Sequence, residues 1–362
     1  MLCLGIETSC DETAVALVND GQLIDQRLAS QIDVHAVFGG VVPEIASREH
    51  LRILPTLFRE LVKENGVDPQ EIDTVAVARG PGLLGALLIG LSFAKALSLS
   101  CNARLVGVNH LWAHLLASGL ERSIPFPAMG LLVSGGHTHT YRIGSPVEFD
   151  LLGKTLDDAA GEAFDKVAKT LNFPYPGGKY VDMLAQGVEP DKKLFPRAFI
   201  DNPSLDFSFS GLKTAVAVYV QAHQEVVLPH MGEGDCAAFL EALSPEAREH
   251  VACICASFNW SVADTLRIKV ERALKKTGHV KSLVVAGGVA ANSIIRKTMA
   301  DLADRYGLQL VLPSLGLCTD NASMIAYAGE LLAQNGFEHD LTLEAIPRGR
   351  IVPMDWLIRR GG

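Results

Sequence analysis

The sequence predicts an α/β protein built from two halves of similar layout. In the first half, three short apolar runs are separated by tight turns that contain Asp11, Asp20 and Gly21, a pattern typical of a meander of hairpins. In the second half, three strand-like runs joined by glycine-containing turns are again followed by helices and further strands. This repeated order predicts a duplicated actin-like or sugar-kinase (ASKHA) two-lobed fold with a central, nucleotide-binding cleft.

The elements of the first half follow from apolar runs and their periodicity. We expect strands at 2–6, 13–18 and 22–28, an amphipathic helix at 43–64, a strand at 74–79, an apolar helix from Leu84 and a strand at 104–108, followed by a helix with two histidines. The apolar helix is interrupted by Gly85, Gly90 and Lys95. We therefore expect a buried helix there and no membrane span.

The second half repeats the order from residue 128 onward. We expect strands at 128–134, 137–143 and 147–153, a helix at about 157–171, and a strand–helix–strand–helix series from 282. The segment 221–248, rich in Glu, His and Gly, is interpreted as a solvated insertion. We expect a first lobe at 1–108, joined by C-terminal helices at about 335–362, and a second lobe at 109–334.

Composition narrows the class of protein. At 362 residues the chain is long for a single hydrophobic core, so two domains are expected. Because its net charge is −9, binding to a nucleic acid would require a local basic patch or a basic partner subunit. Seven cysteines without a CxxC pair indicate a reducing compartment. The first residues lack the basic segment and apolar run of a signal peptide, so we expect a cytoplasmic protein.

Two histidines four residues apart, His110 and His114, are the first candidates for chemistry. On one helix face their Cβ atoms would lie about 5–6 Å apart, which suits a single metal ion. A zinc protease would carry glutamate directly after the first histidine, where this sequence has Leu111. Two satisfied core histidines are the alternative interpretation of the same spacing.

Asp320 is the candidate third ligand. It follows a short apolar strand and opens an apolar helix, with Thr319 as the expected N-cap. Residues just after strand ends line the ligand crevice of a doubly wound fold. Two histidines and one carboxylate leave coordination positions open, as in non-haem iron or catalytic zinc sites.

Glycine-rich turns are the second set of candidates. The Gly135–Gly136 pair in "VSGGHT" lets backbone amides approach an anion, although a plain type I′ turn explains the same residues. "VVAGGVAAN" places two glycines between a strand and a helix start, where N–H groups can hold a phosphate, and Asn292 adds an amide. "YPGGKYVD" is a third glycine-rich helix entry.

Acidic residues gather in two places. Glu7, Asp11 and Glu12 surround the first hairpin, where an actin-like fold brings its first phosphate loop. Asp165 belongs to a run of acidic residues at near-helical spacing, which is either a solvated helix face or a group that holds ligand hydroxyls such as those of a ribose.

Taken together, these stretches resemble one family. The motifs "GIETSCDETAVAL", "RGPGLLGALLIG", "NHLWAHLL", "LVSGGHT", "DDAAGEAFDKVAK", "PYPGG", "FSFSGLKTAV", "VAGGVAAN" and "CTDNASMIAYAG" are similar to those of the TsaD family, in order from Leu2 to about Gly329. The resemblance implies transfer of a threonylcarbamoyl group from threonylcarbamoyl-AMP to the exocyclic amine of adenosine 37, next to the anticodon, in tRNAs that read codons beginning with A.

The resemblance also assigns residues. It implies one divalent metal per chain, Fe²⁺ favoured and Zn²⁺ the alternative, on His110, His114 and Asp320. Substrate-binding positions are Val133, Ser134, Gly135, Gly136, His137, Asp165, Gly178, Asp182 and Asn292, and Asp11 and Glu12 match a catalytic acidic pair. Two departures are His139, which could add an imidazole near the metal, and the long 221–248 insertion.

The implied ligands and partners are threonylcarbamoyl-AMP or ATP/ADP in the cleft, tRNA, and partner subunits of the TsaB and TsaE type, with no membrane. Three alternatives stay open at this point: a metalloprotease, which is the family's former description, an ATPase or phosphotransferase of the sugar-kinase type, and a non-catalytic scaffold. Candidate phosphate contacts for tRNA lie at 191–197, at Lys213, at Arg296 with Lys297, and at Arg348, Arg350, Arg359 and Arg360.

Overall fold

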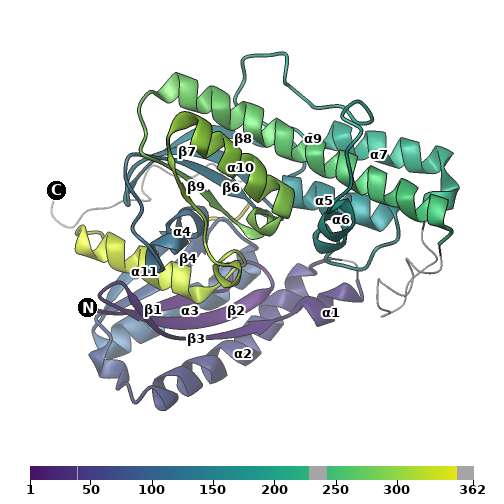
Figure 1. Ribbon diagram of the computed structural model, residues 1–362. Helices are drawn as coiled ribbons and strands as arrows, with labels where there is room; N and C mark the ends of the chain where they lie inside the picture. Colours follow the sequence, from purple (N-terminus) through teal and green to yellow (C-terminus); the bar gives the residue numbers. More distant parts are fainter. Residues whose placement is uncertain (39, 228–242, 349–362) are drawn as a thin grey trace. The chain divides into compact units, whose positions relative to one another are not determined.

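The computed structural model contains two five-stranded sheets, and the strands of both sheets follow the same order along the chain (Figure 1). The first sheet has the order β3-β2-β1-β4-β5 and the second the order β8-β7-β6-β9-β10. In each, the first strand pairs with a hairpin strand on one side and with a parallel strand on the other. The structure describes residues 1–38, 40–227 and 243–348. The duplicated α/β fold predicted from the sequence is confirmed.

The first unit contains Met1–Ile124, Gly144–Phe149 and the segment from Pro313. Its elements are β1 (Leu2–Glu7), β2 (Glu12–Asn19), β3 (Gln22–Ser30), α1 (Ile32–Ala36), α2 (Pro43–Glu64), η1 (Pro69–Glu71), β4 (Thr74–Gly80), α3 (Leu84–Cys101), β5 (Arg104–Asn109), α4 (His110–Leu116), η2 (Ala117–Leu120), η5 (Leu315–Leu317) and α11 (Ala322–Gln334). Helix α2 begins with proline, whose fixed φ suits a first helical position, and it buries Leu54 and Phe58 against the sheet.

Helix α3 is the single helix within the described residues that is long and apolar enough to cross a membrane. It packs against β4 and α2 through a buried face that includes Leu87, Leu91 and Ala94. The opposite face, with Leu88 and Leu99, is exposed. The prediction of a buried helix is therefore confirmed for the face that packs against β4 and α2. Helices in the cores of globular proteins can also be long and apolar enough to cross a membrane.

Helix α11 packs directly on the first sheet, which changes the expected lobe boundaries. A Cβ atom at Gly5 of β1 would lie 2.4 Å from the carbonyl oxygen of Ala322, and one at Gly329 would lie 2.2 Å from Cβ of Ala76. These close approaches hold α11 against the first sheet, and α4 packs against α11. Both helices belong to the first unit, whereas 109–334 was predicted to form the second lobe. The described part of the expected C-terminal helices, 335–348, contains no helix, and residues 349–362 lie outside the described residues.

The second unit contains Pro125–Ile143 and Asp150–Leu312. Its elements are β6 (Ala128–Val133), most of β7 (Thr138–Ser145) and β8 (Glu148–Lys154), α5 (Ala160–Thr170), α6 (Gly178–Ala185), α7 (Ser210–Ala222), η3 (Gln224–Val226), α9 (Pro245–Thr277), β9 (Ser282–Ala286), η4 (Gly288–Ala291), α10 (Ser293–Tyr306) and β10 (Gln309–Val311). The long helix α9, green in Figure 1, packs against α6 and α10. Within the expected insertion, the structure describes the end of α7, η3 and the start of α9, and residues 228–242 lie outside the described residues.

Candidate functional site

Helix α4 places His110 and His114 on one face, as their spacing predicts. Strand β5 ends at Asn109, whose side-chain oxygen accepts hydrogen bonds from the backbone N–H groups of Leu111, at 2.9 Å, and Trp112, at 3.4 Å. This N-cap starts the helix at His110 and puts His114 one turn later. Both imidazoles are buried, and their ring centroids lie 4.7 Å apart.

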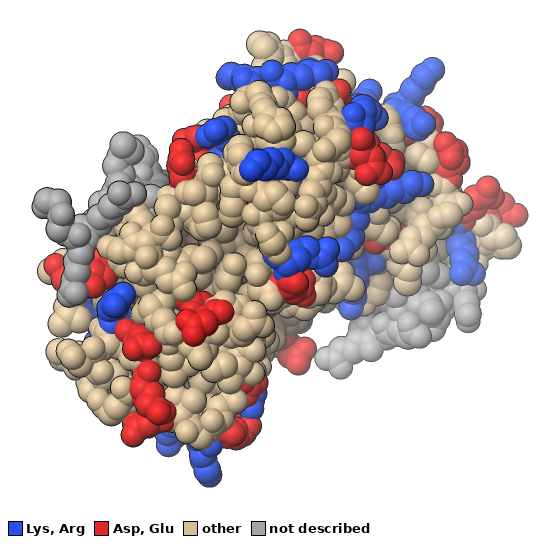
Figure 2. Space-filling view, turned by 60° about the vertical axis from the view of Figure 1, so that its left-hand side comes forward, with Lys and Arg blue, Asp and Glu red and all other residues tan. Residues whose placement is uncertain are grey.

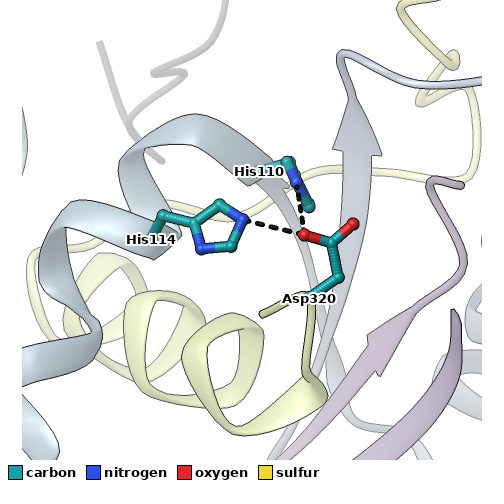
Figure 3. Close-up of side chains that lie close together, drawn as sticks. All are labelled: His110, His114 and Asp320. Carbon is teal, nitrogen blue, oxygen red and sulfur yellow. Dashed lines mark hydrogen bonds and ion pairs between the residues drawn. The ribbon is translucent and has the colours of Figure 1, made fainter. Parts of the chain in front are cut away.

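Asp320 reaches the histidines from the loop before α11. Its Oδ1 lies 3.0 Å from Nε2 of His114 and 3.5 Å from Nε2 of His110 (Figure 3). The structure therefore brings the three predicted ligands together. The N-cap of α11 is Asn321, whose side chain accepts from the N–H of Met324, so the expected cap at Thr319 was wrong.

Glu7 supports His110 from the opposite side of the ring. Its Oε2 lies 2.9 Å from Nδ1 of His110, and Ser9 Oγ lies 3.2 Å from the same nitrogen. The N–H of Ser9 also donates to Glu7 Oε1 at 2.5 Å, which fixes the carboxylate. A carboxylate that holds Nδ1–H leaves Nε2 with a lone pair for a metal, so Glu7 has the geometry of an outer-shell partner.

Glu7 is among the acidic residues expected around the first hairpin, but its partnership with His110 was not predicted. A signal was present, because β1, β4 and β5 are parallel neighbours and their carboxyl ends meet at one sheet edge. Glu7 ends β1, and His110 directly follows β5.

The charges of the cluster shift the pKa values of its members in opposite directions. Burial lowers the pKa of His110, but the carboxylates of Glu7 and Asp320 raise it well above its usual value. Burial opposes ionisation of Asp320, yet His110 and His114 hold its pKa well below the usual range. Burial and the negative charges of Asp320 and Asp11 raise the pKa of Glu12 to about 9. The predicted pair Asp11 and Glu12 therefore lies within the electrostatic reach of this cluster.

The donor set fits a divalent transition metal. Ligand bonds of 2.0–2.2 Å in a tetrahedral arrangement place donor atoms about 3.3–3.6 Å apart. The two nitrogen-to-oxygen separations around Asp320 Oδ1, 3.0 and 3.5 Å, lie close to that spacing. Two neutral imidazoles and one carboxylate are ligands that both Fe²⁺ and Zn²⁺ accept.

A second group of predicted residues lies in the second unit, around the loop between β6 and β7. Ser134 closes this loop, since its N–H donates to the carbonyl of His137 at 2.8 Å and its Oγ accepts from the N–H of His137 at 3.1 Å. Val133 is buried at the end of β6, and Gly135 is exposed. A Cβ atom on Gly135 would meet nothing within 4 Å, so this glycine leaves open space beside the loop.

Two other glycines hold their segments against the same loop. A Cβ at Gly161, in the first turn of α5, would lie 2.7 Å from the carbonyl oxygen of Ser134. A Cβ at Gly287, after β9, would lie 2.4 Å from the carbonyl oxygen of Val133, and the φ of Gly287 is +94°. The loop, the start of α5 and the turn after β9 thus converge, which is an arrangement suited to an anion.

The remaining predicted residues are engaged within the second unit. Asp165 accepts a hydrogen bond from the N–H of Gly177 at 2.9 Å and another from the N–H of Gly178, while burial raises its pKa. Its carboxylate therefore fixes the start of α6, next to the predicted Gly178. His139 bonds to the hydroxyl of Tyr141 through Nδ1 at 2.9 Å, and burial lowers its pKa to about 4.

Asp182 and Asn292 meet at the start of α10 through Asn259, a residue that the sequence analysis did not single out. Asn259 donates to Asp182 at 3.2 Å and accepts from the amide of Asn292 at 2.9 Å. Asp182 also accepts from the N–H of Ser293 at 3.0 Å, and Asn292 is the N-cap of α10. Their ligand-binding role stays a prediction, because the described contacts serve the helix start.

Fold and site together define the class of protein: a duplicated α/β protein of the actin-like or sugar-kinase kind that carries a cluster of two buried histidines and one partly exposed carboxylate. HypF of T. kodakarensis is a solved structure with a similar fold, with a TM-score of 0.54 at 15% identity, covering 92% of this chain and 48% of HypF.

The sequence of the chain also matches one known protein family. The model of the family "TsaD: tRNA N6-adenosine threonylcarbamoyltransferase" matches residues 22–327. A tRNA N6-adenosine threonylcarbamoyltransferase of Maridesulfovibrio salexigens is 63% identical over 99% of both chains, and one of Nitratidesulfovibrio vulgaris is 59% identical over 98% of both. The chain belongs to the TsaD family, and it is a transferase.

Proposed function

We propose that this chain transfers a threonylcarbamoyl group from threonylcarbamoyl-AMP to the exocyclic amine of adenosine 37 in tRNAs that read codons beginning with A. The observation that carries the proposal is the convergence of His110, His114 and Asp320 in a member of the TsaD family. The family name supplies the transferred group and the accepting nucleoside, and the cluster supplies a centre for the chemistry.

The proposed reaction forms one bond and breaks one. The adenosine nitrogen attacks the carbamoyl carbonyl carbon, the bond from that carbon to the phosphate oxygen breaks, AMP leaves with the electron pair, and the amine loses a proton. Because the mixed anhydride already carries a good leaving group, no glutamate is needed to activate water. This agrees with the buried Leu111 at the position where a zinc protease has its general base.

The residues of the first unit would hold the metal and orient its ligands. His110, His114 and Asp320 would hold one divalent ion, Fe²⁺ or Zn²⁺, while Glu7 keeps Nε2 of His110 directed toward it. When bound, that ion supplies a Lewis acid for a carbonyl or a phosphate oxygen. Asp11 adds negative charge beside the cluster, whereas the raised pKa of Glu12, about 9, keeps that carboxyl protonated at neutral pH. The catalytic role of both residues is part of the proposal.

The residues of the second unit would bind the adenylate part of the donor, or ATP or ADP in its place. The loop from Ser134 to His137 lies against the N-terminus of α5, and the helix dipole makes that end partly positive. The N–H groups of Ser134, His137, Ala160 and Gly161 donate within this unit, so the donor would approach from the Gly135 side of the loop. The open space beside Gly135 allows a ligand to approach the backbone closely.

We propose that binding of the acceptor tRNA needs partner subunits of the TsaB and TsaE type. The reaction is proposed to take place in the cytoplasm. The chain carries a net charge of −9, and basic and acidic side chains are interspersed on the face drawn in Figure 2. Two candidate phosphate contacts are paired with carboxylates, Lys213 with Asp158 at 2.5 Å and Arg197 with Asp264. Arg350, Arg359 and Arg360 lie outside the described residues.

The salt dependence of tRNA binding tests the partner requirement. Binding to the isolated chain should be weak and should fall steeply with salt, because phosphate contacts release counterions. Tight binding that does not change with salt would contradict the need for partners.

The central test is transfer of labelled threonylcarbamoyl to tRNA with the partner proteins supplied. The intact chain should transfer the label, and His114→Ala should not, whereas His279→Ala, at an exposed position, should behave like the intact chain. Equal transfer by all three chains would make His110 and His114 core histidines. ATP hydrolysis without transfer by the intact chain would favour the phosphotransferase alternative.

A further inference from the structure

A second group of metal-ligating side chains lies outside the site described above, at the border of the segment interpreted as an insertion. It consists of His223, Glu225 and His250 in the second unit. His223 directly follows α7, Glu225 belongs to η3, and His250 lies near the start of α9. His223 and Glu225 lie two residues apart in one segment, and tertiary contacts bring His250 of α9 to them.

Both imidazoles point to one carboxylate oxygen. Nδ1 of His223 lies 3.2 Å from Glu225 Oε1, and Nδ1 of His250 lies 3.4 Å from the same atom. Tetrahedral zinc with bonds of 2.0–2.2 Å requires donor atoms about 3.3–3.6 Å apart. The two measured separations lie close to that requirement, as those of the first cluster do.

We propose that His223, Glu225 and His250 form a second divalent-metal site, of the zinc class, distinct from the site on His110, His114 and Asp320. Imidazole donors favour zinc and neighbouring transition metals, whereas Ca²⁺ and Mg²⁺ prefer sites made of oxygen ligands. The cluster is partly open to solvent, with side-chain exposures of 39, 54 and 27% for His223, Glu225 and His250. A metal can therefore enter, and water can complete its coordination.

Tyr219 of α7 holds both rings in place. Its hydroxyl lies 2.8 Å from Nε2 of His250, so Nδ1 is the nitrogen that faces Glu225. Its ring stacks on His223, with centroids 4.4 Å apart and planes 30° apart. Such a hydrogen bond from the far ring nitrogen fixes the tautomer and orientation of a ligating histidine. Val226, next to Glu225, is fully buried and anchors η3.

The consequence of metal binding would be structural. The site joins η3, directly after α7, to the start of α9, and a metal there would link these two elements in the folded state only. Binding to the folded state and not to the unfolded state raises the unfolding temperature with metal concentration. The proposal does not depend on the transfer reaction.

The test is a count of bound zinc in the full-length chain. The intact chain, Glu225→Gln and His250→Gln are loaded with Zn²⁺, dialysed against zinc-free buffer and analysed for metal per chain, with circular dichroism as the check of folding. His279→Gln, which changes an exposed histidine of the same unit, is the matched control. We expect each cluster variant to bind one equivalent less than the intact chain and the control to lose none.

The quantity tested is the difference of one zinc equivalent between the intact chain and each cluster variant. The result therefore does not depend on whether the site on His110, His114 and Asp320 holds zinc. The zinc-induced rise in unfolding temperature should shrink in both cluster variants and persist in the control. Equal zinc content and equal thermal shifts in all four chains would overturn the proposal, and so would zinc that the intact chain loses entirely on dialysis. Glu225→Gln keeps an oxygen acceptor for both histidines, which separates metal binding from hydrogen bonding.

Discussion

The first hairpin loops of the two units occupy the same place in the fold but differ in chemistry. Both connect the first and second strands of a sheet, at residues 8–11 and at residues 134–137. In the first, Thr8, Ser9 and Asp11 are buried. In the second, Gly135 is exposed and has open space around it.

The difference teaches how a duplicated fold acquires two kinds of site. The loop of the first unit directs side chains inward, where Ser9 fixes Glu7 and both contact His110. The loop of the second unit keeps its backbone accessible, and the side chain of Ser134 closes its turn. Because Gly161 has no side chain, the start of α5 can approach this turn closely. Topology sets the position of each loop, and residue type decides whether the loop directs its side chains inward or keeps its backbone accessible.

Removing the carboxylate ligand should have the largest effect on the first site. We expect Asp320→Ala to lose the metal and the transfer activity, with a fall in metal affinity greater than the roughly 10–100-fold typical of outer-shell partners. Two buried imidazoles without their carboxylate cannot hold the ion in place. The measurement is metal content together with labelled threonylcarbamoyl transfer.

Asp33→Ala, at an exposed aspartate of the same unit, is the control and should keep both properties. Full metal content in Asp320→Ala would mean that the ion, where present, binds elsewhere. Retained transfer without metal would remove the Lewis acid from the proposed reaction.

Changing the support of His110 should have the next largest effect. Glu7→Gln keeps the size of the side chain but removes the negative charge that lies 2.9 Å from Nδ1 of His110. We expect metal affinity to fall by about 10–100-fold while the fold is retained. Ser9→Ala, which removes a contact at 3.2 Å to the same nitrogen, should cost less. Equal affinities for Glu7→Gln and the intact chain, by competition with a chelator, would show that Glu7 does not act on the metal.

Acidification should weaken metal binding at the first site. Burial opposes protonation of His110, but Glu7 and Asp320 raise its pKa well above the usual value, so the metal-free site holds a proton at neutral pH. A metal needs the neutral imidazole and must displace that proton, so affinity should fall by about tenfold per pH unit for one displaced proton. Calorimetry in buffers of different ionisation enthalpy measures the protons released. A release of none between pH 6 and 8 would contradict this competition.

The same comparison shows what sequence patterns can and cannot predict. The strands and helix α2 were predicted within two residues in the first unit, because hairpin turns and apolar periodicity are local signals. The cluster of His110, His114 and Asp320 was predicted from spacing on α4 and from a carboxylate expected directly after a strand. The expected strand is absent from the described residues at that point, because β10 ends at Val311 and η5 lies between it and Asp320. The partnership of Glu7 with His110 was missed, since it depends on how β1 and β5 align across β4.

The unit boundary also lay beyond local signals. Helix α11 joins the first unit through close packing at Gly5 and Gly329, which no periodicity reveals. Asp182 and Asn292 were predicted separately, and their link through Asn259 depends on the packing of α6 and α10 against α9. Long-range packing decided each of these features.

The smallest expected effect is a change in nucleotide affinity at the glycine loop of the second unit. In Gly161→Ala, the added methyl would lie 2.7 Å from the Ser134 carbonyl oxygen and must displace the loop or α5. We expect adenine-nucleotide affinity to fall about tenfold, or roughly 1.4 kcal/mol. Gly135→Ala adds the same methyl group where no atom lies within 4 Å, so the fold should tolerate it.

The pair separates two roles of the loop in a titration with labelled ATP. If a ligand approaches the backbone at Gly135, the Gly135→Ala methyl will weaken binding without lowering the unfolding temperature, whereas Gly161→Ala will lower both. If Gly135→Ala binds nucleotide as the intact chain does, the loop at 134–137 is a plain turn. The loops at 8–11 and 134–137 would then differ only in how their residues pack. The two loops would then share a position in the fold without sharing a role in binding.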